Sequence, residues 1–479
     1  MKKAGSSKPG NEELFEWDGK PTFGQALPLA LQHVLAAAVG CVTPAILVAN
    51  AANNAAGGGT VNMGLLIQMS LVFAGLSTLL QLYGNKFHLG SGLPVIIGVS
   101  FAYVPTMTAI ATQAKDVDTI FGAMIIGGVI AIIVGLTITQ IRKVFPPLVI
   151  GTVIFAIGLS LYKTAINYMA GNSANTYAVV VEQRGQTEAL VYGSWQNWLV
   201  AFVTLGVVVV LNHYGKGILK LASILVGLVC GYVLALFFGM VDFSALATAG
   251  WFQMPMPFAF GIRFDVSAII PLGILFLVNS IQAVGDFSAT TSGGMDRLPT
   301  DKELNGGIIG YGISNIVSAC FGCPPTATYS QNVGIVGSTK VVSRKVFTMS
   351  AVILTVAGLI PKFSALLRTI PQCVLGGAVA SVFASIAMTG IKLLVSEGLS
   401  ARNTTVVGLS IAIGMGVSLS PGCLNQMTAS IHQALHLGIV LEDLQEIINN
   451  TFASSPVVLA TIFAVLLNLV LPKDQPETN

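Results

Sequence analysis

No Asp, Glu, Lys or Arg side chain occurs between Lys20 and Lys86. Because one helical crossing of a bilayer takes about 20 residues, this stretch is long enough for two membrane spans. The rest of the chain has the same character: 9% of its 479 residues are charged, against roughly 25% in soluble proteins. The sequence therefore predicts a polytopic, all-α membrane protein with no large domain outside the bilayer.

Apolar runs between charged residues or Gly, Pro and Asn breaks predict fourteen spans. They are 25–49, 61–82, 92–111, 119–139, 146–164, 197–212, 219–240, 267–292, 304–322, 326–340, 345–361, 372–395, 402–420 and 451–471. An even number returns the chain to its starting side, and seventeen of the 23 Lys and Arg residues fall in loops on that side. By the positive-inside rule both termini are predicted to be cytoplasmic. The charged N-terminal tail is not followed by a cleavage signature, so we expect no removable signal peptide.

The chain resembles itself at an offset of 225 residues, where 145–166 lie against 370–391. The identical pairs are Pro146/Pro371, Val149/Val374, Gly151/Gly376, Ser160/Ser385, Thr164/Thr389 and Ile166/Ile391. The offset moves the fifth span onto the twelfth, and a displacement by seven spans reverses orientation. This pattern predicts 7+7 inverted repeats, the plan of many secondary transporters. Chance likeness between apolar segments is the alternative.

The third and tenth spans, also seven apart, are both broken. They read 89-LGSGLPVIIGVSFAYVPTM-107 and 321-FGCPPTATYSQNVGIVG-337. Prolines and glycines weaken a continuous helix there, so each span is predicted to be a short extended strand leading into a half-helix. Such backbone is tolerated at membrane depth only where protein or a water-filled cavity satisfies it. Two broken spans at matching positions predict a binding site near the midplane.

Polar side chains gather at these predicted breaks and in two other spans. Gln331 and Asn332 can donate and accept hydrogen bonds toward a flat polar solute, or can cap the half-helix and bond only to protein. Gln282 and Asp286, four residues apart, share a helix face of the eighth span. Asp286 is either a proton carrier or a structural group tying spans together. His33, preceded by Gln32 in the first span, is either a ligand or a satisfied packing residue.

The six cysteines lie almost wholly in apolar runs and are interpreted as small packing residues. The Cys320-x-x-Cys323 pair has no second pair or nearby His to support a metal site. The sequence also has no His/Glu metal cluster, activated nucleophile or phosphate loop. We therefore expect no metal, no cofactor, no nucleic-acid partner and no enzymatic activity.

At these residues the chain resembles the nucleobase-ascorbate transporter family, from about residue 22 to 472. That family's signature in the tenth span is Gln, Glu or Pro, then Asn, any residue, Gly, any four, Thr, and Arg, Lys or Gly. Here it reads Gln331-Asn332-Val333-Gly334, four residues, and Thr339-Lys340. Three further marks agree, namely Gln32-His33, Ser100-Phe101 and Gly285-Asp286.

The resemblance implies a core domain and a gate domain in a cell-membrane protein that dimerises through its gate domains. The core would comprise 22–140 (spans 1–4) and 267–362 (spans 8–11), and the gate 141–266 (spans 5–7) and 363–472 (spans 12–14). Residues 1–21 and 473–479 would be cytoplasmic tails. The implied activity is cation-coupled transport, with a proton or sodium ion as coupling ion, by an elevator-like motion of core against gate.

The implied substrate is a nucleobase stacked near Phe101 and bonded at its edges by Gln331 and residue 282, with backbone amides beside Ser100 and Val333 assisting. Asn332, His33, Asp286, Gln32 and Thr339 would support the site or the coupling. Position 282 is usually Glu in the family, and Gln282 cannot bind and release a proton. Either coupling has moved to Asp286 or His33, or it is impaired.

Gln331 is similar to the xanthine and urate branch, and the small Ser100 would leave room for the additional oxygen of urate. We therefore expect a permease for urate, xanthine or both. One alternative is a uracil or other nucleobase permease. The other is an anion transporter or exchanger of the same 7+7 fold, of the sulfate or bicarbonate class.

Overall fold

The computed structural model describes residues 12–138, 146–171, 192–216, 218–420, 422–424, 426 and 456–472. Its first elements are η1 (Glu12–Leu14), α1 (Phe23–Ala56), α2 (Met63–Tyr83), η2 (Gly84–Phe87), β1 (Ile97–Val99), η3 (Phe101–Tyr103), α3 (Val104–Ala114), α4 (Asp118–Leu136), α6 (Pro147–Met169), α8 (Trp195–Tyr214), α9 (Ile218–Leu221), α10 (Ser223–Phe237) and α11 (Ser244–Thr248). The later ones are α12 (Val266–Met295), α13 (Asp301–Cys320), β2 (Thr326–Thr328), α14 (Ser330–Thr339), α15 (Arg344–Gly358), α16 (Pro361–Arg368), α17 (Gln372–Ser396), α18 (Ala401–Leu419) and α21 (Pro456–Val470).

Each of the fourteen predicted spans overlaps a helix, or a strand followed by a short helix. Among the described residues, seven helices are long and apolar enough to cross a membrane, and the pair α15–α16, bent by 79°, would make an eighth. The predicted helical fold with strands in the two broken spans is confirmed, whereas the count of fourteen stays a prediction. The tail 473–479, residues 1–11 and residues 451–455 lie outside the described part of the chain.

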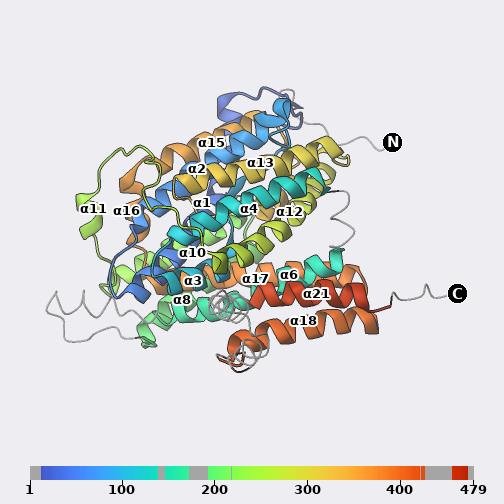
Figure 1. Cartoon of the computed structure of the whole chain (residues 1–479). Coiled ribbons are helices and arrows are strands. Elements are labelled where there is room, and N and C mark those ends of the chain that lie inside the picture. Colours follow the sequence, from blue (N-terminus) through green and yellow to red (C-terminus); the bar gives the residue numbers. More distant parts are fainter. Residues whose placement is uncertain are drawn as a thin grey trace.

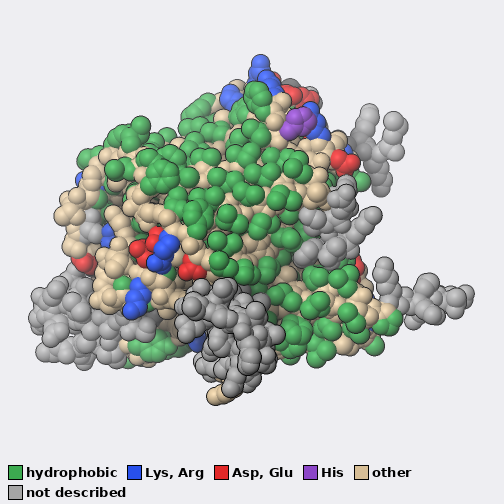
Figure 2. Space-filling view, in the orientation of Figure 1, with side chains coloured by type: hydrophobic (Ala, Val, Ile, Leu, Met, Phe, Trp, Pro, Cys, Tyr) green, Lys and Arg blue, Asp and Glu red, His purple; other side chains and the backbone are tan. Residues whose placement is uncertain are grey.

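The helices form two layers, which Figure 1 shows one above the other. In the upper layer α4 packs on α12 and α13, and α2 packs on α15. In the lower layer α17 packs on α6 and α8, and α18 packs on α21. The face seen in Figure 2 is largely hydrophobic, and charged side chains appear on it in only a few groups. Such a surface suits contact with lipid.

Helices α6 and α17 carry the two segments that resemble each other in sequence, and they pack against each other. Each begins directly after one of the paired prolines, Pro146 and Pro371, which serve as extended N-caps. A Cβ atom at Gly376 would lie 2.3 Å from the backbone nitrogen of Met169, so the helices approach each other as closely as glycine allows.

Strands β1 and β2 pair antiparallel, with Ile97 opposite Thr328, Gly98 opposite Ala327 and Val99 opposite Thr326. Side chains from helices satisfy the backbone groups that the pairing leaves over. The amide of Ile97 donates to Oγ1 of Thr78 at 2.9 Å, and the amide of Thr326 donates to Oδ1 of Asn315 at 2.8 Å. Protein groups therefore replace the missing helical hydrogen bonds, as the two broken spans require.

Gly98, in the middle of β1, lies where three elements meet. A Cβ atom there would be 2.7 Å from Sγ of Cys41 in α1 and 2.8 Å from the ring of Tyr329. The Tyr329 hydroxyl also donates to the carbonyl of Val99 at 2.6 Å. The absence of a side chain at residue 98 thus lets α1 and the end of β2 close around β1.

Candidate functional site

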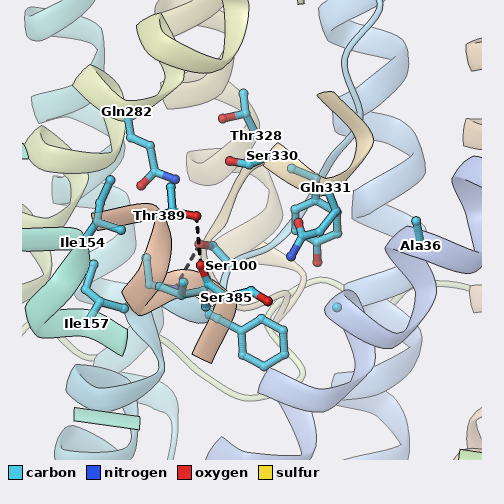
Figure 3. Close-up of a pocket in the computed structure, with 15 residues that line it drawn as sticks. Ala36, Ser100, Ile154, Ile157, Gln282, Thr328, Ser330, Gln331, Ser385 and Thr389 are labelled. Atoms are coloured by element: carbon cyan, nitrogen blue, oxygen red, sulfur yellow. Dashed lines mark hydrogen bonds between the residues drawn. The ribbon is translucent and has the colours of Figure 1, made fainter. Parts of the chain in front are cut away.

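A cavity of about 270 Å³ lies between the two helix layers, where β1 and β2 end (Figure 3). Its walls come from α1, η3, α6, α12, α17 and the β2–α14 junction. The lining residues are Ala36, Gly40, Ser100, Phe101, Ala102, Ile154, Ile157, Gln282, Thr328, Tyr329, Ser330, Gln331, Ser385, Ile386 and Thr389. Both predicted broken spans therefore contribute to a single site.

Four of the predicted binding residues line this cavity: Ser100, Phe101, Gln282 and Gln331. Gln282 reaches it from α12 and Gln331 from the first turn of α14, so two side-chain amides approach from different elements (Figure 3). The hydroxyl of Ser100 accepts a hydrogen bond from the amide of Ala102 at 3.2 Å. This contact holds the small Ser100 side chain against its own backbone.

Phe101 supplies an aromatic ring at the wall of the cavity. Its centroid lies 5.4 Å from that of Phe383 in α17, with the two rings at 77° in an edge-to-face contact. Aromatic pairs favour this arrangement, which fixes the orientation of both rings. The ring of Phe101 therefore sits on the boundary between the two helix layers.

Two short helices begin at the cavity. The η3 helix starts at Phe101 and continues into α3, and α14 starts at Ser330. The first amide groups of a helix have no partner within the helix, and its N-terminus carries a partial positive charge. In these first turns the Ala102 amide already bonds to Ser100 and the Asn332 amide to Tyr329, so the remaining amides are the ones that can meet a carbonyl oxygen or negative charge of a ligand.

Asn332 and Val333, also predicted to bind substrate, are not among the lining residues. The Asn332 side-chain nitrogen lies 3.0 Å from Nδ1 of His33 and donates to the carbonyl of His33 at 3.1 Å. His33 is buried and packs on Phe347 of α15, with ring centroids 4.6 Å apart. Asn332 and His33 therefore connect α14 to α1. Gln32, the residue before His33, is also buried.

Asp286 is buried directly behind the cavity wall. One carboxylate oxygen accepts a hydrogen bond from the hydroxyl of Thr328 at 2.5 Å, and the other accepts one from the hydroxyl of Ser330 at 2.8 Å. These two residues flank Tyr329 at the junction of β2 and α14. Asp286 therefore positions the junction from which Gln331 enters the cavity.

Thr339 lies at the other end of α14. Its hydroxyl donates to the carbonyl of Ile335 at 2.8 Å and accepts from the amide of Val341 at 3.3 Å. It stands nine residues after Ser330, or about 13 Å along the helix. In the described structure Thr339 helps to end α14 and does not line the cavity.

Sequence reasoning did not find the side of the cavity formed by α6 and α17. Ile154 and Ile157 come from α6, and Ser385, Ile386 and Thr389 from α17. A weak signal was present, because Ser385 and Thr389 are four residues apart on one helix face and both belong to the repeat identities. Tyr329, whose hydroxyl joins the two strands, was not singled out either.

Comparisons with known proteins agree on the kind of molecule. Residues 24–423 match the Permease family. The chain is 30% identical to the xanthine permease XanQ of Escherichia coli (strain K12), over 98% of this chain and 96% of that protein. It is 34% identical to the uric acid permease PucJ of Bacillus subtilis (strain 168), over 89% of this chain and 92% of that protein.

Among solved structures, the transmembrane domain of the cyanobacterial bicarbonate transporter BicA is similar, with a TM-score of 0.55 and 20% identity. The likeness covers 79% of this chain and 93% of that domain. The inward-facing murine anion transporter Slc26a9 has a TM-score of 0.56 at 13% identity, covering 86% of this chain and 69% of that chain. At these identities the likeness concerns the fold alone. The family match and the near full-length relatives show that the chain belongs to the nucleobase-ascorbate transporter family of permeases.

Proposed function

We propose that this permease carries urate, xanthine or both across the cell membrane. The observation that carries the proposal is the single cavity in which Phe101, Gln282 and Gln331 meet the starts of two half-helices. A purine has flat faces that pack on an aromatic ring and edges whose N–H and C=O groups pair with amides. The names of the relatives XanQ and PucJ support the same substrate class.

We infer an oxidised purine rather than a uracil-type substrate from the names of the relatives, because both kinds of ring carry a carbonyl beside an N–H that can pair with Gln331. Gln331 can donate to a carbonyl and accept from a ring N–H through one amide. The short side chain of Ser100 takes up less room at the cavity wall than a larger polar residue would, which suits a ring with a further oxygen atom. The two helix N-termini favour the carbonyl-rich edge of such a ring.

The competing function, an anion transporter of the same fold, would use those helix N-termini alone. The structural relatives BicA and Slc26a9 support it at the level of fold. Two inward amides and an aromatic ring favour the purine, because a small inorganic anion needs neither.

The proposed transport cycle moves the core domain, 22–140 and 267–362, past the gate domain, 141–266 and 363–472. The cavity is lined from both, with Gln331 and Phe101 on the core side and Ile154 and Ser385 on the gate side. Substrate would travel with the core because the amides and the half-helices belong to it. We further propose a homodimer joined through the gate domains, with both termini in the cytoplasm.

A panel of possible ligands tests the proposed substrate. Purified protein is heated with xanthine, urate, uracil, adenine, ascorbate, sulfate or bicarbonate, because a ligand that binds only the folded state raises the melting temperature. We expect a rise with urate or xanthine that sulfate and bicarbonate do not reproduce. A rise with sulfate or bicarbonate and with none of the bases would refute the purine function.

Cation coupling is tested by restoring a carboxyl group at position 282. Gln282→Glu is expected to increase the accumulation of urate or xanthine that an inward proton gradient drives in proteoliposomes. Gln282 lines the cavity, and a Glu there could take up and release a proton, which an amide cannot do. Gln253→Glu, outside the cavity, is the control. If the accumulation ratio of Gln282→Glu equals that of the wild-type protein, position 282 takes no part in the coupling.

A further inference from the structure

A second cavity, of about 460 Å³, lies between α3 and α6, and residues of α18 and Pro456 also contribute to its wall. Its polar lining includes Thr108 and Thr112 of α3 and Ser160, Lys163 and Thr164 of α6. None of its described lining residues also lines the central cavity. Its volume is within the range of small-molecule sites.

The second cavity corresponds to the central one through the internal repeat. Ser160 and Thr164 of α6 are the counterparts of Ser385 and Thr389 of α17, which line the central cavity. Helix α3 is likewise the counterpart of α14, since each follows one of the two paired strands. In the predicted topology the third and fifth spans, which hold α3 and α6, both run from the cytoplasmic to the outer side. The second cavity lies beside α3 and the C-terminal half of α6, and therefore toward the predicted outer side.

The two cavities are consecutive along the same helices. Ile157 lines the central cavity and Ser160 lines the second, so about one helical turn of α6, or roughly 5 Å, separates these walls. On the other side, Ala102 lines the central cavity and Pro105 lines the second. A solute leaving the central site toward the outside would meet the second cavity next.

The lining of the second cavity is chemically suited to the same solute. Lys163 is exposed, and among the described residues its ammonium group has no ion pair or hydrogen bond. The hydroxyls of Thr108, Thr112 and Ser160 each donate to a backbone carbonyl of their own helix. Their oxygen atoms can still accept hydrogen bonds from a ring N–H. Lys163 can pair with a carbonyl oxygen or a negative charge on the ring.

We propose that this cavity is a second, weaker purine-binding site that substrate occupies between the outer solution and the central site. Its described lining residues offer a cation and hydroxyl acceptors but include no aromatic ring, so we expect a lower affinity than that of the cavity at Phe101. The inference rests on the proposed purine function, because it takes the substrate class from it.

Kinetics of Lys163 variants provide the first test, in proteoliposomes with urate on the outer side. Lys163→Gln is expected to raise KM for urate roughly two- to fivefold, because one exposed charge contact is lost. The kcat and the rise in melting temperature with urate should stay unchanged. Lys163→Arg should restore the KM. Lys115→Gln, at the end of α3 and outside the cavity, should behave as wild type. An unchanged KM in Lys163→Gln refutes the second site, whereas a wild-type protein that neither binds nor transports purines refutes the proposed function itself.

Thiol labelling provides the second test and separates the two sites. Thr112→Cys is introduced after the exposed Cys230 and Cys423 have been replaced by serine, and a membrane-impermeant thiol reagent is added from each side. We expect labelling from the outer side, slowed by urate even when Gln331→Ala has weakened binding at the central site. Protection that disappears with Gln331→Ala, or labelling only from the inner side, would overturn the assignment.

Discussion

Replacing Gln331 by alanine is expected to weaken the binding of urate or xanthine roughly tenfold or more, because the ring loses paired hydrogen bonds in an enclosed site. The fold should be preserved, since Gln331 is exposed to the cavity in the first turn of α14. Isothermal titration or the rise in melting temperature with ligand measures the effect. The same Gln-to-Ala change at Gln253, outside the cavity, should leave binding as in the wild type.

A Gln331→Ala protein with full purine affinity would show that the ligand does not lie at the α14 N-terminus. The ligand would then have to be sought elsewhere, and the second cavity beside Lys163 would be the first place to look. The melting temperature of Gln331→Ala without ligand is measured as well, because it shows that the variant is folded and that lost affinity reflects the site.

Removing the Asp286 carboxylate is expected to have the largest effect on stability. Asp286→Ala leaves the hydroxyls of the buried Thr328 and the exposed Ser330 without their acceptor, which costs about 3 kcal/mol in the free energy of unfolding. The β2–α14 junction should loosen and transport should be lost. Asp296→Ala, at the exposed end of the same helix, is the matched control and should change little. An Asp286→Ala protein as stable as wild type would contradict the positioning role.

Asp286→Asn separates that positioning role from proton coupling. The amide keeps one oxygen acceptor and adds a donor, so the junction with Thr328 and Ser330 should survive. If Asp286 carries the proton, Asp286→Asn binds purine normally but no longer accumulates it in response to a proton gradient. If accumulation persists, Asp286 serves only to position α14, and His33 becomes the remaining candidate for coupling.

The sequence by itself determined the class of protein, the places of the helices and the two broken spans. Charge depletion and apolar length act locally, so they can be read without knowing the fold. The prolines before β2 and the glycines around β1 likewise mark breaks through local backbone preference. The signature around Gln331 indicated the family, and Ser100, Phe101, Gln282 and Gln331 do line one cavity.

Only the tertiary structure decided which polar groups face the cavity and which face protein. Gln331 and Asn332 are neighbours in sequence, yet one lines the cavity while the other binds His33 about 300 residues away. Likewise, the repeat identities single out Ser385 and Thr389, but only the packing of α17 on α6, with Phe383 against Phe101, makes them cavity residues. Side-chain direction depends on where a helix begins and what it packs against, and such long-range contacts are set by the whole fold rather than by local sequence.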